Sequence, residues 1–347
     1  GPDAAGLRRA RVVGAVIAAV RLFAHAVLIR PIVRAGEAAF TGAVHNLVRV
    51  VLDLNVTYGL IVVAEESIYP CSACNAQMAV KITASDKTTT YSTDFKAAMK
   101  AAENGTKITL LADVSIPQRT GISGDDTTVT LDLNGHKITS GWLDVGDKDT
   151  NGTYTACTLK IIGKGSYEPP MYGGIITVDV KATLDLSEWE GGTISSINIS
   201  DNSGVNQDNP SAREAAVIVG PKAGTIGELS FGNNQLGELK KTKLSGGSFH
   251  EIWVANHLPV KLGDLLVSGY ALQYENGSYE QYTKTLQNGS IYNVKVVKCP
   301  HADAEGGTCL YCGKTGILAK VGDTTYGDVS TAVKGWLAKG GTLKLFT

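Results

Sequence analysis

Methionine and phenylalanine are scarce in this chain, with 3 and 6 residues among 347, whereas glycine reaches 40. This balance indicates many turns and a core of small and β-branched side chains, as repetitive β architectures have. An excess of positive charge is also missing, because the formal net charge is −1. Phosphate binding needs clustered Lys and Arg without balancing acids, so we expect no nucleic-acid partner.

Lysine is missing from the first part of the chain, where the first one is Lys81, and arginine is nearly missing after Arg49. This switch predicts a compositionally distinct segment over residues 1–69, which the apolar spacing indicates to be helical. A membrane span is the more specific interpretation, but Arg21 and His25 interrupt the apolar run between Val12 and Ile29. A charged side chain at the bilayer centre costs ~2.5–3.5 kcal/mol. We therefore expect no membrane contact by residues 1–69.

The body of the chain carries short strand patterns bounded by Gly, Asn, Asp and Ser. Residues 128–139 alternate apolar and polar side chains around an Asn-Gly turn. Further strands are predicted over residues 157–162, 174–180, 182–186, 193–199, 215–219, 224–231, 244–249 and 291–297. Such spacing fits either a β-sandwich or a parallel β-helix. A predicted capping helix over residues 94–102 favours the β-helix, because an open solenoid end exposes core and strand edges.

Three motifs carry a family resemblance: "AAENGTKITLLADVSI" at residues 101–116, "TVTLDLNGHKIT" at 128–139 and "LSGGSF" at 244–249. With the cysteine-rich stretch that follows, they resemble the right-handed parallel β-helix modules of large, adhesin-like cell-surface proteins of Gram-positive bacteria. The resemblance covers roughly residues 91–312. It implies a mainly β fold with an N-terminal capping helix, an extracellular location on the bacterial cell surface, and tandem modules in one chain.

The chain also repeats itself. Tyr91 aligns with Tyr326 at an offset of 235 residues (326 − 91), and the alignment continues without a gap, matching Ala97 with Ala332. We therefore predict five parts: residues 1–69, the helical segment; 70–90, a cysteine-containing linker; 91–298, the β-helix module; 299–320, a Cys/His linker; and 321–347, the start of a second module. This repeat predicts that the natural protein continues.

Cysteine is also scarce, with 6 residues, too few for a disulfide-stapled small protein. Cys299, His301, Cys309 and Cys312 nevertheless supply four soft or borderline ligands within fourteen positions. Tetrahedral zinc prefers such a set, and four protein ligands leave no open position for catalysis. The cluster predicts a structural zinc site; disulfides and free thiols are the alternatives. Cys71 and Cys74 resemble an incomplete copy, and Cys157 is predicted to be a core residue.

Other candidate residues form weaker patterns. Residues 147–152 copy half of an EF-hand loop, but the twelfth position is Thr158, so an ordinary turn is the preferred interpretation over calcium; residues 201–209 are read in the same way. Carboxylates that an enzyme could use are Asp132, Asp144, Asp185, Glu188 and Glu190. Histidines without a catalytic partner pattern are His136, His250 and His257. Aromatic side chains that could stack on sugars or pack in the core are Trp142, Trp189, Trp253, Tyr270, Tyr274, Tyr279 and Tyr282.

These patterns lead to one preferred function and one alternative. We expect a non-catalytic, adhesin-like or scaffold module that presents a ligand-binding surface to a carbohydrate or a host surface protein. The alternative is a polysaccharide-degrading β-helix enzyme, a lyase or a glycosidase. A glycosidase needs two converging carboxylates, which stacked coils could supply, but none of the candidates forms a distinctive motif.

Overall fold

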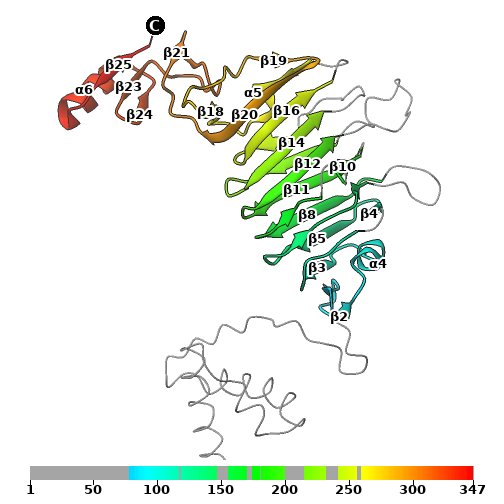
Figure 1. Ribbon diagram of the computed structural model, residues 1–347. Coiled ribbons are helices and arrows are strands. Elements are labelled where there is room, and N and C mark those ends of the chain that lie inside the picture. Colours follow the sequence, from blue (N-terminus) through cyan, green and yellow to red (C-terminus); the bar gives the residue numbers. More distant parts are fainter. Residues whose placement is uncertain are drawn as a thin grey trace, which may run out of the picture. The chain divides into compact units, whose positions relative to one another are not determined.

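A computed structural model of the chain describes residues 78–116, 119–146, 155–169, 174–179, 181–199, 215–231, 241–255 and 259–346 (Figure 1). The predicted helical segment over residues 1–69, the Cys71 and Cys74 pair, the calcium-like loop, residues 201–209 and His257 lie outside these ranges. Within them, no helix has both the length and the apolar character needed to cross a bilayer.

The fold is mainly β and contains two large sheets. The first sheet has the strand order β15-β13-β11-β8-β5-β3-β1-β2. Its strands are β1 (Val80–Thr83), β2 (Thr89–Ser92), β3 (Lys107–Leu110), β5 (Thr128–Asp132), β8 (Thr158–Gly163), β11 (Thr183–Trp189), β13 (Ala216–Val219) and β15 (Lys243–Leu244). All neighbours from β3 to β15 are parallel, and only β1 and β2 at the edge are antiparallel.

The second sheet has the order β18-β20-β16-β14-β12-β10-β7-β4, with β6 and β9 joined to β12. Its strands are β4 (Thr120–Ile122), β6 (Lys137–Ile138), β7 (Leu143–Val145), β9 (Ser166–Tyr167), β10 (Ile176–Val178), β12 (Thr193–Ile199), β14 (Thr225–Phe231), β16 (Ser248–Val254), β18 (Tyr270–Tyr274) and β20 (Gly289–Lys298). Strands β4 to β16 are parallel, and β20 and β18 close the sheet in antiparallel fashion. These parallel pairings exclude the antiparallel sandwich alternative.

The chain alternates between the two sheets as it proceeds from β3 to β16. Each return adds one parallel strand beside the strand of the previous turn, so that the strands form ladders (Figure 1). We call one such turn a coil. In the coils around β7 and β10 the second-sheet part consists of two short strands, β6 with β7 and β9 with β10. In later coils β12, β14 and β16 each run through both positions.

A bend divides these longer strands. In β12, Ile194 and Ile197 are both fully buried although they are three positions apart, and the pairing to β14 skips the residue between Ile194 and Ser196. Strict alternation would place residues three apart on opposite faces. The strand therefore turns a corner and keeps both isoleucines in the core.

The core is a stack of aliphatic side chains contributed by successive coils. In the first sheet Val129, Leu159, Leu184 and Val217 are all 0% exposed, and each lies opposite the next in the strand register. Polar neighbours such as Thr130 and Lys160 lie on the outer face of the same strands. Burial of each aliphatic side chain contributes about 1.5–3 kcal/mol. Alternation of burial thus fixes which face of each strand looks inward.

Helix α4 (Phe95–Lys100) lies at the N-terminal end of the described coils and contacts β4. Asp94 caps it by accepting a hydrogen bond from the Ala97 N–H at 2.9 Å. Phe95, Ala98 and Met99 are buried. The predicted helix is confirmed, and its buried side chains pack against the aliphatic core.

The remaining elements follow β16. They are β17 (Val260–Lys261), α5 (Leu262–Leu265), β19 (Thr285–Leu286), β21 (Ala304–Glu305), β22 (Thr308–Cys309), β23 (Ala319–Val321), β24 (Thr324–Tyr326), α6 (Val329–Lys339) and β25 (Leu343–Leu345). Strands β24, β23 and β25 form a separate antiparallel sheet beside α6. The pairing of β23 with β24 and β25 repeats that of β1 with β2 and β3.

Two of our sequence expectations are corrected by these bounds. Residues 244–249 were predicted as one strand, but β15 ends at Leu244 and β16 begins at Ser248, because Gly247, with φ +85°, turns the chain between the two sheets. The predicted linker, residues 70–90, contains β1 and the first part of β2, which belong to the edge of the first sheet. Most other strand predictions agree with the structure to within a few residues.

The repeat alignment also needs a correction in the helix. Asp328 caps α6 through the Thr331 N–H at 2.7 Å, as Asp94 caps α4, which gives an offset of 234 residues (328 − 94). At this offset Ala332, which is 0% exposed, corresponds to the buried Ala98 and not to the exposed Ala97. The following strands return to an offset of 235, since Leu345 and Leu110 hold the same place in the pairing.

Candidate metal centre

The four predicted ligands lie on two short segments that a tight hairpin brings together. Cys299 follows β20 directly, and His301 comes two residues later. The hairpin of β21 and β22 then places Cys309 opposite Ala304. Its two-residue turn is Gly306-Gly307, with φ +53° and +74°, a conformation that glycine adopts without strain. The chain turns again after Cys309, which delivers Cys312 to the same spot.

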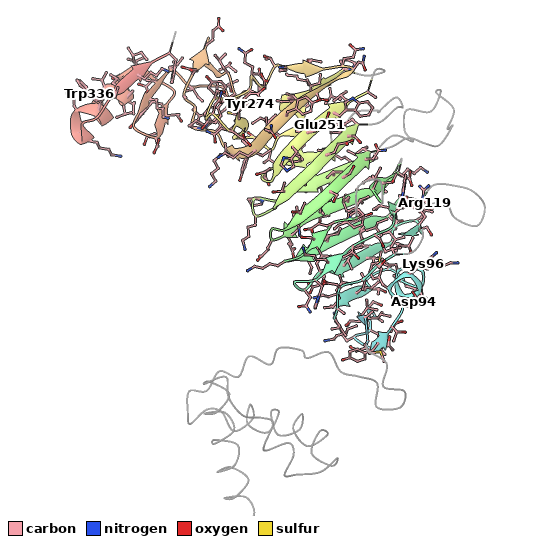
Figure 2. The ribbon with its side chains drawn as sticks, in the orientation of Figure 1. Asp94, Lys96, Arg119, Glu251, Tyr274 and Trp336 are labelled. Carbon is pink, nitrogen blue, oxygen red and sulfur yellow. The ribbon has the colours of Figure 1, made fainter. Side chains whose placement is uncertain are left out.

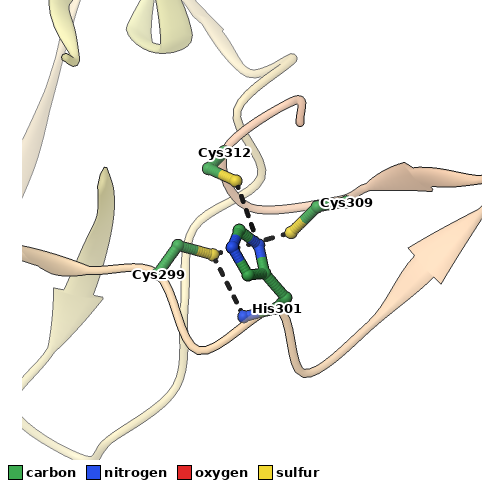
Figure 3. A group of neighbouring side chains, drawn as sticks. All are labelled: Cys299, His301, Cys309 and Cys312. Atoms are coloured by element: carbon green, nitrogen blue, oxygen red, sulfur yellow. Dashed lines mark hydrogen bonds between the residues drawn. The ribbon is translucent and has the colours of Figure 1, made fainter. Parts of the chain in front are cut away.

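The ligand atoms converge. One ligand atom from each of Cys299, His301, Cys309 and Cys312 lies within 4.8 Å of all the others, so the cluster could bind a metal ion. Cys299 Sγ is 3.6 Å from Cys309 Sγ, and Cys312 Sγ is 3.4 Å from His301 Nδ1. The His301 N–H also donates to Cys299 Sγ at 3.4 Å. Figure 3 shows the imidazole between the three sulfur atoms.

These separations fit the edges of a tetrahedral site. Zn–S bonds of ~2.3 Å and Zn–N bonds of ~2.05 Å at tetrahedral angles give S···S edges of ~3.8 Å and S···N edges of ~3.6 Å. The observed 3.6 Å and 3.4 Å are close to both values. A disulfide would need ~2.05 Å between sulfurs. The cysteines of this cluster are free in the structure, and their spacing is compatible with binding of a metal ion.

Hydrogen bonds between the thiols of the cluster shift their pKa values. Hydrogen bonds from Cys299 and Cys312 hold the pKa of Cys309 well below its usual range, whereas the same contact with Cys309 raises the pKa of Cys299. The cluster therefore favours a thiolate at Cys309, and a thiolate is the form of cysteine that binds metals.

A second layer of contacts supports the loop that carries His301. The Asp303 carboxylate accepts hydrogen bonds from the Tyr311 hydroxyl at 2.8 Å and from Lys344 Nζ at 2.5 Å, and these two contacts lower the pKa of Asp303. Lys344 also donates to the Ala302 carbonyl, and Lys320 donates to that of Pro300. Lys344 lies on β25 and Lys320 on β23, so the following sheet holds the loop that carries His301 in place through these hydrogen bonds.

Apolar packing encloses the cluster on the other side. Cys299 and Cys309 are 8% and 0% exposed, and they pack with Ala271 and Ile317 in one small core. The rings of Tyr279 and Tyr311 lie 5.2 Å apart beside it. Sequence reasoning missed Asp303, Tyr311, Lys320 and Lys344. Lys344 lies 41 positions from Asp303, too far for any local spacing to reveal the contact.

Cys157 is not part of the centre. It is 3% exposed beside the aliphatic stack, and burial raises its pKa to about 12. A thiol with so high a pKa is inert at neutral pH. The predicted role as a core residue is confirmed.

Each candidate carboxylate of the enzyme alternative has its own, separate partner. Asp132 pairs with Lys107 at 2.8 Å, Glu188 with Lys160 at 2.6 Å and Glu190 with Lys222 at 2.9 Å. Asp185 accepts a hydrogen bond from the Ser187 N–H, and the buried Asp144 pairs with Arg119. Four of the five therefore face a cation from a neighbouring coil. Asp132 and Asp185 lie between buried leucines and point outward.

The remaining candidates separate into buried and exposed groups. Trp189 is fully buried, and its indole N–H donates to the Gly165 carbonyl at 3.0 Å. Trp142 is 40% exposed, and the Arg119 guanidinium lies 5.8 Å from its ring centroid. His136 contacts Asp113 at 3.3 Å, and His250 is exposed on β16.

Tyr270 and Tyr274 belong to β18 at the end of the second sheet. A tight turn at Gly277 follows β18 and brings Tyr279 opposite Gln273, but the main partner of β18 is β20.

Comparisons of the chain with protein-family models, with curated proteins and with solved structures found no match.

Proposed function

We propose that this chain is a non-catalytic, adhesin-like or scaffold module of a bacterial cell-surface protein. In this proposal the two ladders of strands are faces of one right-handed parallel β-helix, whose outer surface presents a binding site for a carbohydrate or a host surface protein. The Cys299, His301, Cys309 and Cys312 cluster holds a structural zinc ion at the end of the module.

One observation carries the β-helix proposal: the chain alternates between two parallel ladders from β3 to β16 and adds one rung to each at every return. Parallel strands that neighbour one another only through such returns bury a continuous aliphatic stack between the ladders. A chain built this way gains length with each coil, which suits a rod that carries a surface away from the cell.

The ligand set supports zinc in a structural role. Three thiols and one imidazole are soft or borderline ligands that favour zinc over calcium or magnesium. Catalytic zinc sites keep one coordination position for water, whereas this cluster supplies four protein ligands. The lysine contacts to Pro300, Ala302 and Asp303 further tie the loop to the next sheet.

The outer surface supports binding without catalysis. Outward-facing acids of successive coils are paired with lysines, which leaves Asp132, Glu188 and Glu190 in separate ion pairs, and the buried Asp144 is paired with Arg119. Large aromatic side chains remain exposed among the described residues, including Trp142 at 40% and Tyr292 at 57%. Exposed aromatic rings stack on the apolar faces of sugar rings.

A binding and cleavage assay on immobilised polysaccharides tests this function. We expect retention of the protein on at least one surface polysaccharide, with no release of reducing ends or unsaturated products over a day. Trp142→Ala is expected to weaken retention about 10-fold, because one stacking contact contributes about 1.4 kcal/mol. Trp189→Phe is the matched control, since Trp189 is buried and is not available to a ligand.

Release of cleavage products by the wild-type protein would contradict the proposal and favour the enzyme alternative. Equal retention of the two tryptophan variants would remove Trp142 from the binding surface. Binding to a host protein and to no polysaccharide would assign the ligand to the second class.

A further inference from the structure

The unit formed by β23, β24, α6 and β25 exposes apolar side chains of α6 and β25. Val329 is 42% exposed, Trp336 37%, Leu337 71% and Leu345 52%. Trp336 lies on α6, at the opposite end of the described chain from α4 (Figure 2). Ala319, Val321 and Ala332 pack together as the small core of this unit.

The counterparts of Val329 and Leu345 are buried in the unit of β1, β2, α4 and β3. Phe95 begins α4 as Val329 begins α6, and it is 4% exposed against 42%. Leu110 holds the place of Leu345 in the strand pairing, and it is 0% exposed against 52%. Two units with the same pairing thus differ in the burial of these positions.

The covering element in the first unit is the coil that follows β3. Strand β5 pairs in parallel with the outer edge of β3, and α4 contacts β4 of the same coil. Val129 and Leu131 of β5 are both 0% exposed and join Phe95, Met99 and Leu110 in one core. In the second unit the outer edge of β25 has no strand partner among the described residues.

We propose that the face of α6 and β25 is a docking surface for one further β-helix coil, whose leading strand pairs in parallel with β25. The partner carries apolar side chains at alternate positions, as Val129 and Leu131 do, followed by a segment that covers α6. This inference rests on the proposed β-helix and identifies the element that would pack against α6 and β25. The β5 strand of a second copy does not fit, because its two edges are already held by β3 and β8.

The test extends the chain with its own coils. A copy of residues 112–312 is joined after Phe346, which corresponds to Leu111, so that the added segment leaves β25 as residues 112–312 leave β3. Hydrogen exchange is then measured on the peptides of α6 and β25, whose sequences occur once in the extended protein. We expect β25 amides to exchange at least about 100-fold more slowly than in the unextended protein.

The matched control carries Val129→Asp and Leu131→Asp in the added copy alone, which keeps length and connection but removes the inward apolar face. It is expected to leave β25 exchange unchanged. If β5 and β8 are protected in the unextended protein, where their sequences occur once, but β25 exchange does not change on extension, the docking surface is refuted while the β-helix stands. Unprotected β5 and β8 in the original module would refute the β-helix itself. A dimer of the unextended chain with protected β25 would assign the face to a second copy and overturn the proposal.

Discussion

Cys309→Ser is expected to reduce bound zinc from about one ion per chain to below about 0.1, and to release the segment from Cys299 to Cys312 from the rest of the fold. The serine hydroxyl is a poor zinc ligand, and Cys309 is the residue whose thiolate the cluster stabilises most. Structural zinc contributes about 10–16 kcal/mol in small zinc-binding peptides, so the loss of one of four ligands has a large effect. Elemental analysis and hydrogen exchange of residues 299–312 measure the two consequences.

Cys157→Ala provides the control, because it removes a cysteine of the same chain that lies outside the cluster. This variant is expected to keep the zinc content of the wild-type protein. Wild-type protein that contains no metal and no titratable thiols under non-reducing conditions would refute the zinc site and favour disulfides. Thiols without metal after zinc is supplied would also refute it.

The candidate ligands could be predicted from sequence because a chelating set leaves a spacing signal. Cys309 and Cys312 are three positions apart, and the Gly306-Gly307 turn lets the segment from Cys299 fold back. The supporting contacts left no such signal. Lys320 and Lys344 reach the loop only because β23 and β25 pack against it, and that packing depends on the whole following sheet.

The strands could be predicted where burial alternates strictly, as in residues 128–132, and less well where the chain turns between sheets. At Ile194 and Ile197 two buried residues three positions apart resemble a helical step, yet both belong to one bent strand. Local sequence could not show the bend, because it is held by pairing with β9, β10 and β14. The handedness of the coils and the surface location stay predictions.

The repeat illustrates the same limit within one helix. A single offset of 235 residues matched strands and turns but placed Ala97 opposite Ala332. Capping by Asp94 and Asp328 shows that the helices begin at an offset of 234. Ungapped alignment cannot detect a one-residue change between helix and strand when both positions hold alanine. Burial distinguishes them, because only Ala98 and Ala332 face a core.

Gly192→Ala is expected to destabilise the protein by about 2–5 kcal/mol, because the added methyl meets the backbone of the preceding coil. A Cβ at Gly192 would lie 2.0 Å from the Gly165 carbonyl oxygen, and the residue has φ +96°. The Gly192 carbonyl also accepts a hydrogen bond from the Thr225 N–H of the next coil at 2.9 Å. The turn at Gly192, between β11 and β12, is therefore in contact with both the preceding and the following coil and has little room to shift.

Gly191→Ala is the matched control for this effect. Gly191 has φ +88°, so alanine there meets nearly the same backbone strain, but no atom lies within 4 Å of the added Cβ. We expect a cost of about 1–2 kcal/mol from the left-handed conformation alone. The two variants are compared by their urea midpoints at equal m-value. Equal midpoints would mean that the coils do not stack closely at the turn between β11 and β12. Close stacking of successive coils from β8 to β14 would then be refuted.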